Sequence, residues 1–304
     1  MKRKKYICDF KNDVLFKYAL CDDQNPDCVY LLKLMIEDII HIEVDQVTVI
    51  NPDLNPQSLN DKDMILDIQV RTKDGKIIDV EMQNSNLYQS LYQRFQLYGS
   101  RMLVKQEKAG GNYIDLHHVY QIIFIDDIDK DNLVLMDEYV SRNKYGKVEK
   151  YSLMTRTYVY LPYINVISEH KPLSEFNKLE KLIYVFENGF KDGIIESKDE
   201  VVSIMKKKVD EFNQNELLQD MAFNRDLNRK AKATELRDVQ EKAKKEGIEE
   251  GSLQERYNAV LSLFEHFYPD EDNTFLKGKS YQVYQQVFEM LLNQKSLEDI
   301  KKVI

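Results

Sequence analysis

Cysteine is scarce in this chain, and so are the residues that make tight turns. The 304 residues include only 3 Cys, 10 Gly and 6 Pro, and no C-x-x-C pair occurs. Three thiols cannot all pair within one chain, which argues against a disulfide framework, and their spacing argues against a zinc-thiolate site. The shortage of Gly and Pro disfavours an all-β sandwich with many tight turns and favours long helices around a modest sheet.

Long hydrophobic runs are also missing. No apolar stretch approaches the ~20 residues that a membrane-spanning helix needs. The basic N-terminal residues lack the apolar region of a signal peptide. We therefore expect a soluble cytoplasmic protein with no membrane partner. The 43 Lys and Arg against 52 Asp and Glu give a net charge of −9. This acidic balance argues mildly against a protein with a broad basic face for nucleic-acid binding, but it leaves room for a local basic channel.

The hydrophobic pattern predicts an α/β protein, because apolar residues make up 43% of the chain and alternate between strand-like and helix-like spacing. We expect helices over 27–40, 87–106 and 174–187, the last with Ser174 as its N-cap and Gly189 at its end. Strands are expected over 44–50, 118–125, 133–140 and 155–161, besides a hairpin within 62–83.

The C-terminal part has a different character, strongly charged and helical in pattern over 195–260. Residues 225–245 hold eight Lys or Arg and four acids, and Gly247 and Gly251 interrupt the pattern. Helices over 253–267 and 281–292 and a last turn capped by Ser296 follow. The basic run is typical of a solvated helix face, and DNA-backbone binding or a homo-oligomer through this region stays open. We place the domain boundary near 165–173, giving domains 1–165 and 166–304.

The turn of the hairpin decides which polar side chains meet. A two-residue turn at 74–75 would put Asp67 and Glu81 on opposite faces of the two strands. A three-residue loop over 73–75, ending in a left-handed glycine, instead places Asp67 directly opposite Glu81. Gln83 then lies on the same face, two residues further along. We favour this second register because it gathers three polar groups.

Two carboxylates at cross-strand distance repel one another unless a cation lies between them. Magnesium takes one or two carboxylates together with waters and phosphate oxygens, so Asp67 and Glu81 are candidate Mg²⁺ ligands. The alternative is that both acids lie on the solvated face of a sheet, as acids on hairpins often do.

At these residues the sequence resembles the PD-(D/E)XK nucleases, whose core is helix, strand, hairpin, helix, strand. More narrowly, it resembles the recombination-promoting nuclease (Rpn) family, also described as PD-(D/E)XK nuclease family transposases. Several features carry the resemblance, and they occur in the family's order. Asn12 to Lys17 is similar to the family's D-x-x-F-K, and residues 79–83 read D-V-E-M-Q. Arg94 and Tyr98 follow in the next helix, and residues 245–251 read K-E-G-I-E-E-G. It covers residues 9–190 well and the tail loosely.

The resemblance implies a restriction-endonuclease-like mixed sheet flanked by helices, followed by an α-helical C-terminal region. It also implies a metal-dependent DNA endonuclease that hydrolyses phosphodiester bonds and is associated with recombination or mobile elements. Asp67 and Glu81 would bind Mg²⁺ or Mn²⁺ with the Met82 carbonyl, and the metal would activate water. The alternative from another class is a DNA-binding or assembly protein whose nuclease site is weak or inactive.

Further site residues follow from the same resemblance. Gln83 stands where the wider superfamily usually has Lys, and an amide can hydrogen-bond water but carries no charge. Lys17 is a candidate for the missing charge. Asp13 has either an active-site role or the role of a helix N-cap. Substrate-binding candidates share one helix face through their i, i+4 and i+7 spacing, namely Arg94, Tyr98 and Arg101.

Overall fold

The structure is a computed structural model, and it describes residues 8–50, 68–84, 87–107, 111–191 and 193–304. The chain divides into two compact units, Met1–Leu227 and Asn228–Ile304, which we treat separately. None of the described helices combines the length and apolar character needed to span a membrane.

The first unit is built on a mixed sheet of six described strands in the order β1-β2-β3-β4-β6-β5. The inner pairs β3/β4 and β4/β6 are parallel, whereas β1/β2, β2/β3 and β5/β6 are antiparallel. Parallel neighbours require a crossover: helix α3 (Gln89–Val104) lies in the connection from β3 to β4, and strand β5 lies in the connection from β4 to β6. The strands are β1 (Val47–Val49), β2 (Ile68–Thr72), β3 (Ile77–Gln83), β4 (Val119–Ile125), β5 (Met136–Val140) and β6 (Met154–Tyr160).

The hairpin between β2 and β3 has the predicted three-residue loop. The Thr72 amide donates to the carbonyl of Lys76 at 3.0 Å, and Gly75 donates to the carbonyl of Thr72 at 2.9 Å. Gly75 has a φ of +88°, the left-handed region in which a Cβ would be strained. Ile68 therefore pairs with Val80, and the predicted register is confirmed for the described part of β2.

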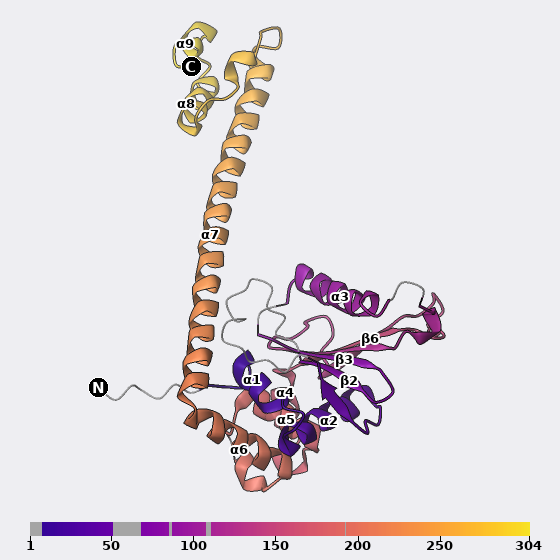
Figure 1. The fold of residues 1–304 in the computed structure, drawn as a ribbon. Helices are drawn as coiled ribbons and strands as arrows, with labels where there is room; N and C mark the ends of the chain where they lie inside the picture. Colours follow the sequence, from indigo (N-terminus) through magenta and orange to yellow (C-terminus); the bar gives the residue numbers. More distant parts are fainter. Residues whose placement is uncertain (1–7, 51–67, 85–86, 108–110, 192) are drawn as a thin grey trace, which may run out of the picture. The chain divides into compact units, whose positions relative to one another are not determined.

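Helices cover the two faces of the sheet unequally. In Figure 1, α3 (Gln89–Val104) lies alone on one side, and the helices labelled α1, α2, α4 and α5 lie on the other. This is the predicted class, an α/β mixed sheet flanked by helices. The first unit also contains α1 (Asp13–Leu20), α2 (Pro26–Ile40), α4 (Tyr163–His170), α5 (Lys178–Asn188), α6 (Glu200–Gln214) and the 3₁₀ turns Tyr113–Asp115, Leu173–Glu175 and Ile194–Ser197.

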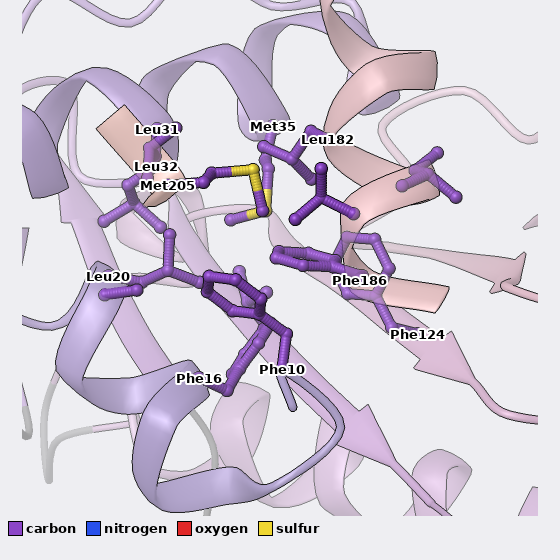
Figure 2. Close-up of a cluster of buried hydrophobic side chains, with 14 of the residues drawn as sticks. Phe10, Phe16, Leu20, Leu31, Leu32, Met35, Phe124, Leu182, Phe186 and Met205 are labelled. Carbon is purple, nitrogen blue, oxygen red and sulfur yellow. The ribbon is translucent and has the colours of Figure 1, made fainter. Parts of the chain in front are cut away.

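The main core lies between the sheet and the larger group of helices. Figure 2 shows side chains from α1, α2, β4, α5 and α6 converging on it. Phe124 of β4 makes edge contacts with Phe16 and Phe186, with ring centroids 6.1 and 5.3 Å apart. Because α5 and α6 share this core, the first unit extends to Leu227 and does not end near residue 165, where we expected the boundary.

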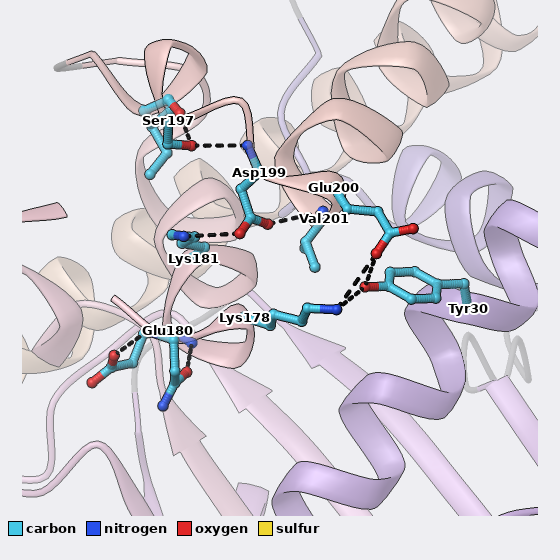
Figure 3. Close-up of polar contacts among 10 residues, drawn as sticks. Tyr30, Lys178, Glu180, Lys181, Ser197, Asp199, Glu200 and Val201 are labelled. Carbon is cyan, nitrogen blue, oxygen red and sulfur yellow. Dashed lines mark hydrogen bonds and ion pairs between the residues drawn. The ribbon is translucent and has the colours of Figure 1, made fainter. Parts of the chain in front are cut away.

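Polar contacts fix the link between α5 and α6 (Figure 3). Asp199 caps α6 by accepting from the Val201 amide at 2.9 Å, and it also accepts from the Lys181 ammonium at 2.8 Å. At the other end of α5, the N-cap is Asn177, which forms a capping box with Glu180. The prediction that Ser174 caps this helix is wrong, because Ser174 belongs to a separate 3₁₀ turn and Asn177 offers the reciprocal cap. Gly189 ends α5 as predicted.

The second unit has its own small core. Val260 and Phe264 of α7 (Glu216–Phe267) pack with Leu276 and with residues of α8 (Tyr281–Leu292) and α9 (Leu297–Lys301). Gly247 and Gly251 do not interrupt α7, because a helix tolerates isolated glycines at a cost of about 1 kcal/mol each. Ser296 caps α9 as predicted, through the Asp299 amide.

Candidate functional site

The candidate site is centred on the second half of β3. Its side chains alternate, so Asp79, Glu81 and Gln83 point to the face that α3 covers, while Ile78 and Val80 join the main core. The Glu81 side chain is 4% exposed, so the solvated-face alternative is wrong for this residue. Asp67, its predicted partner, lies outside the described residues.

Helix α3 brings a guanidinium to this face. A terminal nitrogen of Arg94 donates to Oε1 of Gln83, which joins two of the predicted site residues. The same guanidinium lies over the rings of Phe95 and Tyr98, 5.4 and 5.8 Å from their centroids. Arg101 is exposed on the same helix. The structure thus links Arg94, Tyr98 and Gln83 but leaves Arg101 at the surface.

A buried polar row crosses the sheet beside Glu81, and sequence reasoning missed it. Arg156 of β6 donates through Nε to Oε1 of Gln121 on β4 at 3.0 Å. Gln121 donates in turn to Asp79 of β3 at 3.4 Å, and both Gln121 and Asp79 are fully buried. The register pairs all three residues side by side. Gln121 was the available signal, because it is the one polar residue between Val119 and Ile125 with an amide side chain.

Gly99 lets α3 approach this row closely. A Cβ at this position would stand 2.8 Å from the methyl carbon of Met154 and closer still to Oε1 of Gln121. Both distances are shorter than real Cβ atoms show, so a side chain here would displace one of the neighbours. The absence of a side chain at Gly99 therefore permits the close packing of α3 on the polar row.

The next row of the same face holds Glu81, Ile123 and Tyr158. Burial raises the pKa of Tyr158 to about 12, although the charge and hydrogen bond of Arg156 act in the opposite direction, and the carboxylate of Glu81 adds to the rise. Tyr158 therefore keeps its proton at neutral pH. Arg156 contacts both rows, through Gln121 in the first and Tyr158 in the second.

A second charged group lies where β3 and β4 end. Lys11 forms ion pairs with Asp126 at 2.8 Å and with Glu187 at 2.9 Å, and its carbonyl accepts from Asn84 at 3.1 Å. Burial alone would lower the pKa of Lys11, but the hydrogen bonds to the two carboxylates outweigh it and raise the pKa. These contacts tie the segment before α1 to the carboxyl ends of the central strands.

The described contacts of Asp13 and Lys17 are with residues other than Gln83. Asn12, and not Asp13, is the N-cap of α1, and its side chain accepts from the Val14 amide. Asp13 instead forms an ion pair with Arg225 at 2.6 Å. Lys17 is buried on the same helix and lies near Cys21, whose thiol its charge affects. Both therefore stay as predictions for the site, without a described contact to Glu81 or Gln83.

The oxygen ligands of this face suit a hard divalent cation. Magnesium prefers carboxylate and carbonyl oxygens and needs only one or two protein carboxylates, and β3 offers the Glu81 carboxylate and the Met82 main-chain carbonyl. Within the described residues, no three acidic, His or Cys side chains gather in an arrangement that could hold a metal. The predicted pair therefore depends on Asp67.

The basic run of α7 has the character of a solvated face. Arg225 is held by Asp13, and further along Arg237 pairs with Glu241 at 3.0 Å and Lys242 with Glu246 at 3.9 Å. The described side chains over 227–252 are exposed. Such exposed i, i+4 pairs stabilise a helix by only a few tenths of a kcal/mol.

A mixed α/β sheet with an acid-bearing hairpin beneath a single helix defines the nuclease-like class expected above. Comparison with known families gives the same result: the model of the PD-(D/E)XK nuclease family transposase matches residues 10–246. This match covers most of the chain, and the chain belongs to that family. Searches of curated proteins and of solved structures find no match of significance.

Proposed function

We propose that this protein is a metal-dependent DNA endonuclease that hydrolyses phosphodiester bonds, in the setting of recombination or mobile elements that its family suggests. The observation that carries the proposal is Glu81, a carboxylate 4% exposed on a central strand and aligned by the three-residue hairpin. Burying a carboxylate is unfavourable unless its charge is offset, and a bound cation is a group that offsets it. Membership in the family supports the same assignment.

In this proposal Asp67 and Glu81 hold Mg²⁺ or Mn²⁺, with the Met82 carbonyl as a further ligand. When bound, the metal would supply a Lewis acid at the scissile phosphate and a water of lowered pKa. Glu81 is preorganised for this role because β3 is paired on both sides, with β2 and with β4. A ligand on a doubly paired strand keeps its geometry better than one on a loop.

Gln83 and Arg94 act together in the proposed site. Arginine can only donate, so the Gln83 atom that faces Arg94 must be the oxygen, which leaves the amide nitrogen of Gln83 as a donor. A Lys at this position would bring both a donor and a charge. Here the amide brings the donor, and the guanidinium next to it brings the charge. Arg94 is thus a second candidate, beside Lys17, for the charge that a Lys at position 83 would bring.

The decisive experiment compares Glu81→Gln with Glu169→Gln, an exposed glutamate on α4 that serves as the matched control. Cleavage of supercoiled plasmid in Mg²⁺ or Mn²⁺ should fall roughly 1000-fold for Glu81→Gln, because a metal ligand contributes several kcal/mol to transition-state stabilisation. The control should cut like the wild type. Binding of Mn²⁺, measured by calorimetry, should be lost in the same variant, and Asp67→Asn should behave like Glu81→Gln. Full activity of Glu81→Gln would overturn the proposal.

The role of Arg94 is tested through its charge. Arg94→Gln should lower cleavage about 10- to 100-fold without weakening Mn²⁺ binding, and Gln83→Lys should restore activity in that background. If Gln83→Lys fails to restore activity, the argument that Gln83 and Arg94 together replace a lysine is wrong. A wild type that binds Mn²⁺ and DNA but never cuts would favour the alternative of a DNA-binding or assembly protein with an inactive site.

A further inference from the structure

The connection between β5 and β6 forms a second, exposed hairpin, which we call the β5–β6 hairpin (residues 141–153). Asn143 pairs with Lys147 through a main-chain hydrogen bond of 2.9 Å, and Gly146, with φ +81°, closes the loop by donating to the Asn143 carbonyl at 2.9 Å. The Asn143 side chain accepts from the amides of Tyr145 and Lys147. This tip is held by its own hydrogen bonds, and its backbone conformation is therefore defined without packing on the rest of the unit.

Two tyrosine rings stand on this hairpin almost fully in solvent. Tyr145 is 82% exposed and Tyr151 is 83% exposed, the highest exposures among the described tyrosines. Each ring has a neighbouring lysine over it, with the ammonium of Lys144 at 4.9 Å from one centroid and that of Lys150 at 4.7 Å from the other. Exposed rings gain nothing from burial in this fold, so their placement on a fixed turn points to an external ligand.

The charge of the hairpin is opposite to that of the chain. Its cations are Arg142, Lys144, Lys147 and Lys150, and its one acid is Glu149, in a protein whose net charge is −9. All side chains from 141 to 151 are exposed. A cationic surface on an acidic protein selects anionic partners by charge complementarity. Interleaved cations and aromatic rings are the combination that binds a nucleic-acid strand, through phosphates and base faces respectively.

Backbone strain adds a third observation. Tyr151 has a φ of +61°, in the left-handed region that non-glycine residues seldom adopt. The adjacent turn holds it there, with the Ser152 amide donating to the Glu149 carbonyl at 3.4 Å. Strain of this kind costs on the order of 1–3 kcal/mol and tends to occur at ligand-binding positions. Here the residue in the left-handed conformation carries an aromatic ring that is 83% exposed.

The hairpin begins at the row of the sheet that contains Met154, and Glu81 lies four strand residues away, in the row of Tyr158. At about 3.3 Å per residue, the two rows are roughly 13 Å apart. The exposed rings lie beyond Met154 along the hairpin, further still from Glu81, so the hairpin is a surface separate from the candidate site.

We propose that the β5–β6 hairpin binds a nucleic-acid strand with unpaired bases, its lysines and arginine contacting phosphates and the rings of Tyr145 and Tyr151 stacking on bases. The inference rests on the proposed function in assuming a nucleic-acid ligand, but it concerns a surface outside the metal site. A duplex presents its bases already stacked, so unpaired or frayed strands are the form that these rings recognise.

The test measures binding in EDTA, where no cleavage takes place, using a fluorescein-labelled single strand and a duplex with closed ends. Tyr145→Ala and Tyr151→Ala should each weaken single-strand binding about 5- to 150-fold, the loss expected per stacked base. Binding to the duplex should change little. The matched control is Tyr281→Ala in the second unit, because Tyr281 is also exposed, at 42%, and also lies beneath a cation, Arg256.

Three further comparisons sharpen the result. Tyr145→Phe should bind like the wild type, because the ring stacks without its hydroxyl. Replacing Lys144 and Lys147 by Gln should reduce the salt slope of binding by about 0.7 per lost phosphate contact. Because the chain contains no tryptophan, Tyr145→Trp provides a unique fluorophore that stacked bases should quench, whereas Tyr281→Trp should not respond.

The outcomes separate this inference from the proposed function. If Glu81→Gln stops cleavage while the tyrosine variants bind like the wild type, the nuclease stands and the hairpin inference falls. Equal losses on single strand and duplex, or an effect of Tyr281→Ala as large as that of Tyr145→Ala, would also overturn it. Weakened single-strand binding by both tyrosine variants supports it, whether or not the plasmid is cut.

Discussion

The two faces of the central sheet are made by alternating residues of the same strands, yet only one of them combines apolar packing with a set of buried polar groups. On the face toward α1, α2 and α5, strand β3 presents Ile78 and Val80, and β4 presents Ile122 and Phe124. On the face toward α3, β3 presents Asp79, Glu81 and Gln83. The first face stabilises the fold through burial of apolar surface. The second face carries polar groups whose hydrogen-bond partners come from neighbouring strands and from α3.

This difference teaches how a site can be both buried and polar. The face that contains Phe124 contributes hydrophobic free energy without needing a defined hydrogen-bonding geometry. The face under α3 depends on register, because Arg156, Gln121 and Asp79 meet only if three strands align. The apolar face therefore tolerates repacking, and the polar face does not.

The largest expected effect comes from removing an aromatic ring on either face. Phe124→Ala and Phe95→Ala should each lower the free energy of unfolding by about 3–5 kcal/mol, because both rings are fully buried against other aromatic rings. Urea unfolding measures this loss. Only Phe95→Ala should also lower the rate of plasmid cleavage per folded molecule, since Arg94 lies over the Phe95 ring. An equal loss of cleavage in both variants would erase the distinction between the faces.

A smaller effect is expected from the polar row. Arg156→Met should lower the free energy of unfolding by about 1–3 kcal/mol, because Gln121 loses a charged donor inside the sheet layer. The double variant with Gln121→Met should cost less than the sum of the two single variants, as measured in a double-mutant cycle. Strict additivity of the two losses would mean that the row is not a coupled network.

The smallest effect concerns pH on the apolar side, where Cys21 belongs to the main core. Burial raises the pKa of its thiol from 9.0 to about 12, and the charge of Lys17 only partly opposes this. The unfolded thiol therefore loses its proton first, so stability falls as the pH rises above the ordinary thiol value. Between pH 8 and pH 10, the free energy of unfolding of the wild type should fall by about 1 kcal/mol more than that of Cys21→Ala. Urea unfolding at the two pH values measures this, and an equal fall in the two proteins would contradict the burial argument.

Local features of the sequence were sufficient for most elements of the fold. The hairpin register followed from the loop over 73–75, and the strand over 118–125 is close to the observed Val119–Ile125. Helix ends were predicted well where one cap dominates, as at Gly189. Ser174 failed as a cap because Asn177, three residues later, forms a reciprocal cap with Glu180 that a single-residue signal does not reveal.

The rest depended on pairing between distant segments. Asp79, Gln121 and Arg156 are separated by long stretches of sequence, and only the parallel order β3-β4-β6 makes them neighbours. Spacing within one segment cannot reveal such a row. The domain boundary failed for a related reason, because the helices after residue 165 complete the core around Phe124. The contact between Arg94 and Gln83 was predictable in part: both residues were predicted for the site, but the hydrogen bond between them was not.

Gly99 has a consequence for how this sequence can change over generations. Because a side chain at this position would collide with Gln121, substitutions at the two positions are not independent. A larger residue at 99 displaces the end of the Gln121 side chain, and that end is the oxygen that accepts from Arg156. A change at position 99 therefore affects Arg156 on the neighbouring strand, and we expect substitutions on the helix and on the strand beneath it to occur together.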